Sequence, residues 1–261
     1  SSYGGTNHGR HAYATVLAWQ PRFVVDFGCG DNAFILLDTV CHGAPHGEFC
    51  EQRAAWLAER LAGQFDYRGD GQTYDDMRNA DMMAVINRRR GLPVALGILY
   101  IHVARAQGWS LTGLNFPGHF LLRLAMPDGL AIIDPFNGGR TRNMEELQAL
   151  LNRIAGREVA LQPEHMAPVP LRHVLMRLQN NIRIRAEQAG DLNRAAEILH
   201  RVSLFAPREP GVWLDRADLA AKSGNLMAAQ EILDDGLGHL GGVGAAQLLE
   251  QAREKLTRRL N

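Results

Sequence analysis

Pro117-Gly118-His119-Phe120 and Ile133-Asp134-Pro135-Phe136 place a histidine and an aspartate fifteen residues apart in a chain of 261 residues. Each stretch borders an apolar run, 120–125 for the first and 130–133 for the second. If these runs pair as neighbouring strands, His119 and Asp134 come within hydrogen-bond reach. An imidazole oriented by a carboxylate is the base–acid half of a nucleophile–base–acid triad. The pair is therefore the first candidate for a catalytic site.

A buried helix is predicted just before these strands. Residues 94–107 are apolar nearly all round, which is typical of a helix that packs on every face. Pro93 suits its first turn, where a backbone N–H is not needed, and Gly108 suits its C-terminal cap. This helix would form the centre of the core.

The other predicted elements follow the same hydrophobic periods and indicate an α+β fold. Apolar runs split by Pro127-Asp128-Gly129 predict a small antiparallel sheet with a hairpin. The predicted helices cover 34–41, 48–64, 81–90 and 144–155, and the predicted strands cover 111–116, 119–126 and 130–133.

The C-terminal region contains an internal repeat. Residues 190–199 match residues 224–233 at an offset of 34, with Ala195 and Ala229 at the same position. Thirty-four residues is the tetratricopeptide period, and small side chains let its paired helices pack closely. Pro163, Pro168 and Pro170 predict a linker and a boundary near residue 165. The predicted division is 1–72, a mostly helical segment, 73–165, the core domain, and 166–261, a tetratricopeptide-like helical region.

Charge and composition narrow the classes of partner. Lys+Arg and Asp+Glu are both 28, so the formal net charge is zero and no global basic field indicates nucleic acid. No apolar run approaches the roughly 20 residues that cross a bilayer. The first residues lack the pattern of a signal peptide. Three cysteines, an odd number, lack the spacing of a metal site or a disulfide framework. These features predict a cytoplasmic protein with no membrane association and no cofactor.

A buried helix followed by strands that carry His and then Asp resembles the transglutaminase-like branch of the papain-type cysteine hydrolase superfamily. The resemblance implies a cysteine at the N-terminus of the helix, where the dipole and a nearby imidazolium lower its pKa and its thiolate attacks an amide or acyl carbon. In this chain Gly91-Leu92-Pro93 occupies that position. Pro93 has no nucleophilic side chain, so the resemblance implies a degenerate site that keeps His119 and Asp134.

Three longer stretches resemble one subgroup, the SirB-type bacterial proteins, whose members join a transglutaminase-like domain to tetratricopeptide-like helices. A proline in place of the cysteine is usual in that subgroup. The resemblance covers roughly residues 73–235, and it implies no particular activity. The stretches are 89–94, 115–123 and 133–139.

Arg123, Asn79 and Asn115 are candidate binding residues. Arg123 lies four residues after His119, so strand alternation directs it to the same face. It would bind a carboxylate or phosphate, or else pair with Asp134 or Asp128. The two asparagines lie close in sequence to the motifs, Asn79 before an arginine run at 88–90 and Asn115 directly before the histidine stretch. The arginine run itself suits a solvated helix end.

Two functions remain open for the His119–Asp134 pair. The first is a binding or regulatory protein that holds a peptide or protein segment without turning it over, with repeat-like helices that offer a concave surface. The second is a hydrolase or acyl-transfer enzyme in which His119, oriented by Asp134, acts as general base on water. Pro93 at the nucleophile's position favours the first.

Weaker alternatives involve other residues. One of the cysteines, Cys29, Cys41 or Cys50, would replace the missing nucleophile if its sulfur lay against the His119 ring. His119 and His102 would hold a metal with nearby carboxylates, although their spacing is unremarkable. Residues 24–32 are similar to the glycine-rich loop of a methyltransferase that binds S-adenosylmethionine, but Asn32 stands where the third glycine belongs.

Overall fold

The structure is a computed structural model that describes residues 49–260. It divides the chain into two compact units, the first ending at Val174 and the second beginning at Leu175. The glycine-rich loop at 24–32, the predicted helix at 34–41, Cys29 and Cys41 lie outside the described residues. The predicted three-part division of the chain stays a prediction.

The first unit is built on a five-stranded sheet in the order β6-β5-β4-β3-β7, with every neighbouring pair antiparallel. A tight turn joins β4 and β5, as the Pro127-Asp128-Gly129 stretch predicts. The strands are β3 (Leu111–Leu114), β4 (Leu122–Met126), β5 (Gly129–Asp134), β6 (Arg140–Arg142) and β7 (Pro168–Val169). The predicted α+β class is confirmed by this arrangement and by the helices on both faces of the sheet.

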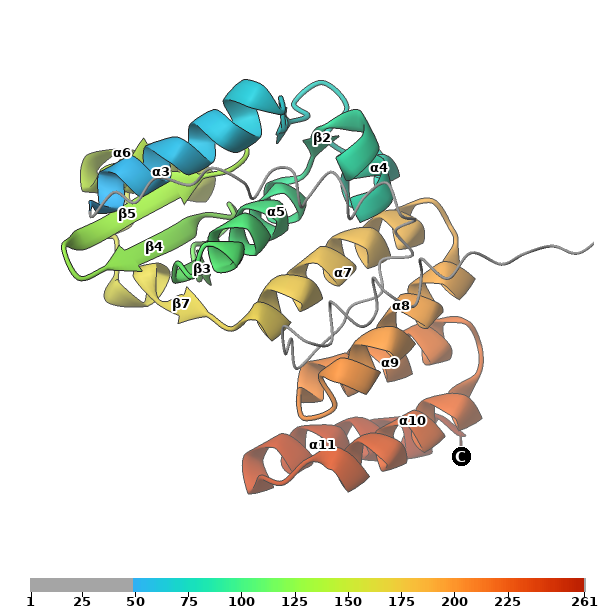
Figure 1. The fold of residues 1–261 in the computed structure, drawn as a ribbon. Coiled ribbons are helices and arrows are strands. Elements are labelled where there is room, and N and C mark those ends of the chain that lie inside the picture. Colours follow the sequence, from blue (N-terminus) through green and yellow to red (C-terminus); the bar gives the residue numbers. More distant parts are fainter. Residues whose placement is uncertain (1–48, 261) are drawn as a thin grey trace, which may run out of the picture. The chain divides into compact units, whose positions relative to one another are not determined.

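Helices cover the two faces of this sheet (Figure 1). One face is covered by α3 (Cys50–Ala58), which contacts β4, β5 and β6, and by α5 (Pro93–Ala106), which contacts β3. The other face is covered by α6 (Met144–Ala155). Its leucines join a buried cluster with strand residues: Leu114, Phe116, Leu121, Ile132, Leu147, Leu150 and Leu151.

The central helix α5 begins at Pro93, and most of its residues are buried. The chain turns after it at Gly108, which has φ +72°, the left-handed conformation that glycine adopts without a Cβ penalty. Gly97 lets the helix approach the sheet, because a Cβ there would collide with the buried ring of Phe120. The helix predicted over 94–107 is therefore confirmed, together with its two end signals.

The segment before α5 differs from the prediction. The predicted helix at 81–90 is α4 (Met82–Arg88), which ends early because Arg89 adopts φ 58°. Residues Arg90–Gly91 form β2, which pairs in parallel with β1 (Arg68–Gly69). A short 3-10 helix, η2 (Met77–Asn79), precedes α4. The predicted helix at 48–64 runs as α3 and continues as a π-helix, η1 (Glu59–Gln64).

Two further corrections concern strand ends and linkers. The apolar pattern predicts a strand from residue 119, but β4 begins only at Leu122, so His119 lies in the bend before it. The proline-rich stretch near residue 165 is not a free linker, since η3 (Pro163–Met166) is followed by β7. Pro168 pairs with Leu114 at the edge of the sheet, where a missing N–H is tolerated.

The second unit is helical, and its sequence repeat corresponds to α8 and α10. Each of these helices starts with a capped turn, in which the Asp191 side chain accepts from Arg194 N and the Asn225 side chain accepts from Ala228 N, both at 3.0 Å. Ala195 and Ala229 are both fully buried. Its helices are α7 (Leu171–Gln188), whose first residues up to Val174 belong to the first unit, α8 (Leu192–Phe205), α9 (Pro210–Lys222), α10 (Leu226–His239) and α11 (Val243–Leu260).

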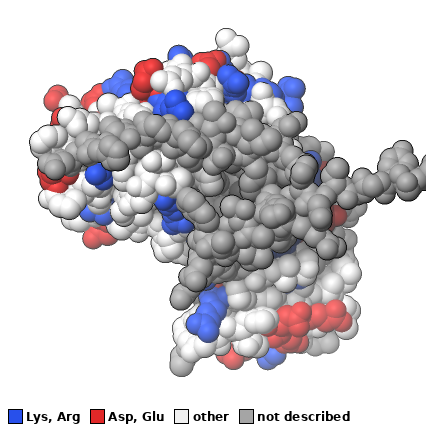
Figure 2. Space-filling view, viewed as in Figure 1, with Lys and Arg blue, Asp and Glu red and all other residues white. Residues whose placement is uncertain are grey.

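On the face that Figure 2 shows, acidic and basic side chains are mixed over the upper part, and a small group of acidic side chains lies at the lower right. This matches the zero formal charge of the whole chain. Among the helices of residues 49–260, none combines the length and the apolar character that crossing a bilayer requires.

Candidate functional site

His119 and Asp134 form the hydrogen-bonded pair on which the candidate site is centred. The imidazole Nε2 lies 3.1 Å from Asp134 Oδ1. The carboxylate is fully buried, while the histidine side chain keeps 16% of its surface exposed. The bend at 117–119 presents His119, and the last residue of β5 presents Asp134. Of the two side chains, only the imidazole reaches solvent.

The Asp134 carboxylate also accepts hydrogen bonds from Asn137 and Arg142. Asn137 donates its backbone N–H to Oδ1 at 3.2 Å and its side-chain amide to Oδ2 at 2.8 Å. Arg142 donates Nη2 and Nε to Oδ2 at 2.6 and 3.1 Å. Each carboxylate oxygen therefore has defined donors, as a buried charge requires.

These contacts determine the ionisation of Asp134. Burial alone would raise the pKa of the carboxyl group, but the hydrogen bond and charge of His119, followed by the bonds from Arg142 and Asn137, lower it to about 2. Opposite charges and donors to the charged form outweigh desolvation here. Asp134 is therefore a carboxylate at neutral pH.

Arg142 also lies near the N-terminus of α6. Its Nη1 lies 4.0 Å from Glu146 Oε1, and Glu146 also pairs with Arg140. Glu146 and Asn143 form a capping box, in which Asn143 Oδ1 accepts from Glu146 N at 2.8 Å and Glu146 Oε2 accepts from Asn143 N at 3.1 Å. A continuous polar path thus runs from the helix cap to the imidazole.

Tyr100 places a hydroxyl beside this network. The side chain is fully buried, and the hydroxyl has no hydrogen-bond partner among the residues that the structure describes. Burial, with the negative charge of Asp134 acting in the same direction, raises the pKa of Tyr100. Position 139 has φ +76°, and a Cβ there would collide with the Tyr100 hydroxyl, so only glycine fits at this position.

An aromatic row borders the imidazole. The rings of His119 and Phe136 meet edge to face at 6.4 Å, and those of Phe136 and Tyr74 meet in the same way at 5.9 Å. Phe136 lies over Gly69, where a Cβ would overlap its ring. The loop that follows β1 therefore forms a wall of the site.

Pro93 occupies the first position of α5, as the sequence predicts. Its φ suits a first helical turn, and its missing N–H would have had no partner there. The preceding Leu92 donates its N–H to Asn79 O at 2.8 Å, which fixes the entry into the helix. At this position Pro93 supplies neither a nucleophilic side chain nor a backbone donor.

The three predicted binding residues lie in different surroundings. Asn79 is fully buried. Its side chain donates to Thr73 O and accepts from Arg88 Nη1, so it links the loop at Thr73 to the end of α4. Asn115 is exposed and donates its side-chain amide to Glu164 O at 3.5 Å. Neither contact involves the His119–Asp134 pair.

Arg123 is half-buried on β4, opposite Thr112 and Ile132 in the neighbouring strands. The guanidinium that bonds to Asp134 is that of Arg142 rather than that of Arg123. Whether Arg123 binds a ligand stays a prediction.

Cys50 is the only cysteine among the described residues. Its side chain is 3% exposed, and its Sγ donates to Leu124 O at 3.6 Å. Its backbone N–H donates to Asp128 Oδ2 at 2.6 Å. Burial raises the pKa of the thiol, and Asp128 adds to this effect. These surroundings suit an inert core thiol rather than a nucleophile. Within residues 49–260 no cluster of His, Cys, Asp and Glu side chains suits a metal ion.

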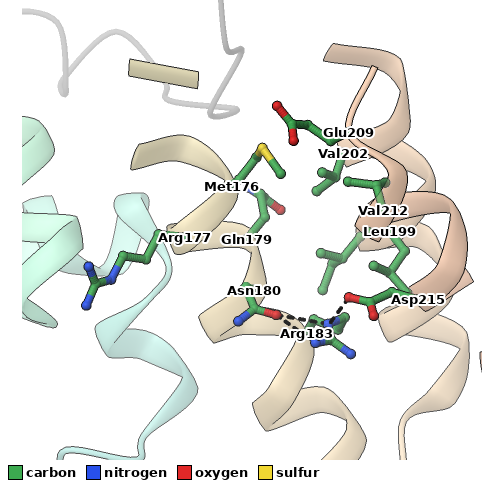
Figure 3. A pocket seen from close by; sticks show the side chains of 12 residues that line it. Met176, Arg177, Gln179, Asn180, Arg183, Leu199, Val202, Glu209, Val212 and Asp215 are labelled. Carbon is green, nitrogen blue, oxygen red and sulfur yellow. Dashed lines mark hydrogen bonds and ion pairs between the residues drawn. The ribbon is translucent and has the colours of Figure 1, made fainter. Parts of the chain in front are cut away.

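A cavity of about 430 Å³ lies in the second unit, between α7 and the α8–α9 pair (Figure 3). Ile198, Leu199, Val202 and Val212 supply apolar walls. Arg183 borders it and bonds to Asn180 Oδ1 at 2.7 Å, with Asp215 Oδ2 at 3.6 Å. The cavity combines an apolar interior with a polar edge, as ligand sites commonly do.

Sequence reasoning found His119 and Asp134 but missed Arg142 and Asn137. The available signal was the alternation of Arg140 and Arg142, which follows a turn containing Gly138-Gly139 and suggests a short edge strand. The apolar run before Asp134 already indicates that its carboxylate is buried. Two arginines on one face of a neighbouring strand would therefore have predicted the cation that pairs with it.

Comparison with known proteins finds a superfamily and several bacterial relatives to which the chain is similar. The profile of the transglutaminase-like superfamily matches residues 35–180, more than half of the chain. A UPF0162 protein from Xylella fastidiosa is 37% identical over 156 residues, which are 58% of this chain and 54% of that protein. A UPF0162 protein from Pseudomonas aeruginosa is 31% identical over 156 residues, 60% of this chain and 56% of that protein.

A more distant similarity reaches eukaryotes. F-box only protein 21 from Homo sapiens is 32% identical over 101 residues, which are 36% of this chain and 16% of that protein. The chain spans about half the length of the bacterial relatives named above. No solved structure matches it.

Proposed function

Since this chain belongs to the transglutaminase-like superfamily, we propose that it is a catalytically degenerate, SirB-type member that binds a peptide or protein segment. The observation that carries the proposal is Pro93 at the first position of α5, with His119 and Asp134 retained 3.1 Å apart. An oriented imidazole without a thiol can hold a polar group of a ligand but cannot form an acyl-enzyme. The role would be cytoplasmic and regulatory.

The surroundings of the imidazole support binding of a peptide. Phe136 and Tyr74 offer ring faces and edges next to His119, and aromatic side chains contribute much of the contact area in peptide recognition. In the second unit, which we assign as tetratricopeptide-like, the cavity between α7 and α8–α9 offers a second surface. Paired helices of this kind commonly bind extended segments.

The test uses the full chain and a random-peptide phage library. We expect enriched peptides that bind with saturation, that bind more weakly to His119→Ala, and whose mass is unchanged after long incubation. His200→Ala, an exposed histidine on α8, is the matched control and should bind normally. A peptide that is cleaved or transferred, with the activity lost in His119→Ala, would replace binding with catalysis.

The alternative is a hydrolase that uses no covalent intermediate. The specific observation in its favour is that Asp134 is ionised and aligned on Nε2, the arrangement of a general base. If synthetic ester or amide substrates are turned over, the pH–rate profile should shift in Asp134→Asn. Turnover that is insensitive to both His119→Ala and Asp134→Asn would end this alternative.

A further inference from the structure

We propose that Arg142 is a positioning residue for this site: with Asn137 it fixes Asp134 as a carboxylate in one orientation, so that whenever the His119 imidazole is neutral its proton is on Nε2 and Nδ1 is the acceptor. The inference deepens the proposed function, because it rests on His119 being the working group of the site. It concerns a residue in β6, outside both sequence motifs.

The geometry divides the two carboxylate oxygens between different donors. Arg142 sends Nη2 and Nε to Oδ2, and the Asn137 side chain reaches the same oxygen. Oδ1 is then directed toward His119 Nε2 and the Asn137 backbone N–H. Because the carboxylate is fully buried, water cannot take over these bonds if a donor is lost. Arg142 is thus what holds the carboxylate plane in place.

The proton assignment on His119 follows from the charge on Asp134. An ionised carboxylate has lone pairs and no proton, so it can only accept a hydrogen bond. The nitrogen 3.1 Å from Oδ1 is Nε2, and it must therefore be the N–H. In a neutral imidazole the second nitrogen is then an acceptor. In that state Nδ1 of His119 can accept a hydrogen bond but cannot donate one.

Loss of the Arg142 guanidinium should change which nitrogen of His119 carries the proton. The groups that face the Asp134 carboxylate come from separate elements. They are His119 in the bend, Asn137 in the turn, Arg142 in β6 and the Tyr100 hydroxyl in α5. Without Arg142 the buried carboxylate loses its fixed cation and can take up a proton or rotate. A protonated Asp134 would donate to Nε2, which places the imidazole proton on Nδ1 instead. The tautomer of His119 therefore reports on Arg142 directly.

The experiment is nitrogen-15 NMR of the histidine side chains in the full chain, with the His119 signals assigned from their loss in His119→Gln. Spectra of each protein are recorded as the pH is raised until the ring shifts stop changing, so that the neutral imidazole is observed. On that plateau we expect wild-type shifts of a single tautomer with the proton on Nε2, and averaged or reversed shifts in Arg142→Gln. Arg140→Gln is the matched control, because Arg140 lies on the same strand and pairs with Glu146. It should keep the wild-type shifts.

A second variant keeps the test decisive if Arg142→Gln does not fold. Arg142→Lys retains a positive charge but lacks the planar fork that places two donors on Oδ2, so we expect a mixture of tautomers. Wild-type ring shifts in either variant, with a native amide spectrum, would overturn the proposal, as would a wild-type protein with the proton on Nδ1. The measurement needs no ligand, so failure of the peptide-binding test leaves its outcome readable.

Discussion

Among single residues of the first unit, Asp134 should contribute strongly to the free energy of unfolding. It is a fully buried carboxylate with donors from His119, Asn137 and Arg142. Asp134→Asn would turn an amide N–H₂ toward at least one of these donors and leave Arg142 without its partner. We expect a loss of about 3 kcal/mol in unfolding free energy, measured by urea denaturation. Asp128→Asn, an exposed position in the β4–β5 turn, should cost less than about 1 kcal/mol. Equal losses would contradict the assigned role of Asp134.

Cys50 gives a second prediction at this scale. Its thiol is buried and its pKa is raised, so iodoacetamide should label it only after denaturation. Peptide mass spectrometry of native and urea-treated protein reads this out at the single residue. Rapid labelling of Cys50 in the native protein would reopen the possibility that it replaces the missing nucleophile.

Among the helices and strands, those with a long apolar period could be predicted from the sequence, whereas the short edge strands could not. The α5 helix has a continuous apolar pattern with Pro93 and Gly108 at its ends, so its position followed from local signals. The strands β6 and β7 have three and two residues, too few for a period to appear. Their pairing depends on the register against β5 and β3, which tertiary packing decides. The candidate site was therefore predictable as a pair and not as a network.

Two glycines of α10 provide a matched prediction. A Cβ at Gly236 would lie 2.6 Å from Leu249 Cδ2 and 2.7 Å from Trp213 Cγ, whereas a Cβ at Gly238 meets nothing within 4 Å. Gly236→Ala should destabilise the second unit by about 1–3 kcal/mol through overpacking. Gly238→Ala should stabilise it by about 0.5 kcal/mol through helix propensity.

Hydrogen exchange across α10 and α11 measures both variants in one experiment. Stabilisation in both would show that α11 packs less closely on α10 than Gly236 implies. Destabilisation in both would show that Gly238 has neighbours that the described residues do not supply.

Over the whole molecule, acid should affect the two units in opposite directions. In the first unit hydrogen bonds lower the pKa of Asp134 and Asp70 to about 2, from an ordinary value of 3.8. Their stabilisation is complete above pH 3.8 and is lost as the pH falls toward 2, with Asp134 contributing about 2 kcal/mol. In the second unit burial raises the pKa of Asp215, although Arg183 opposes this. Protonation of Asp215 therefore relieves a penalty, so acid stabilises that unit.

Hydrogen exchange between pH 5 and pH 2 should show this divergence, after correction for the intrinsic exchange rates. The first unit should lose protection, and Asp134→Asn should flatten its pH dependence. The second unit should hold or gain protection, and Asp215→Asn should remove the gain. Parallel loss in both units, unchanged by the two substitutions, would contradict the assigned pKa directions.

The polar path from α6 to His119 also sets the smallest segment that can carry this site. The two sequence motifs end at Phe136, but Arg142 and the Glu146 near it follow them in the chain. A shortened protein or a grafted fragment that stopped at the second motif would keep both signature side chains and lose what orients them. A substitution in β6 alone would therefore alter the site while every residue of the two motifs stays the same.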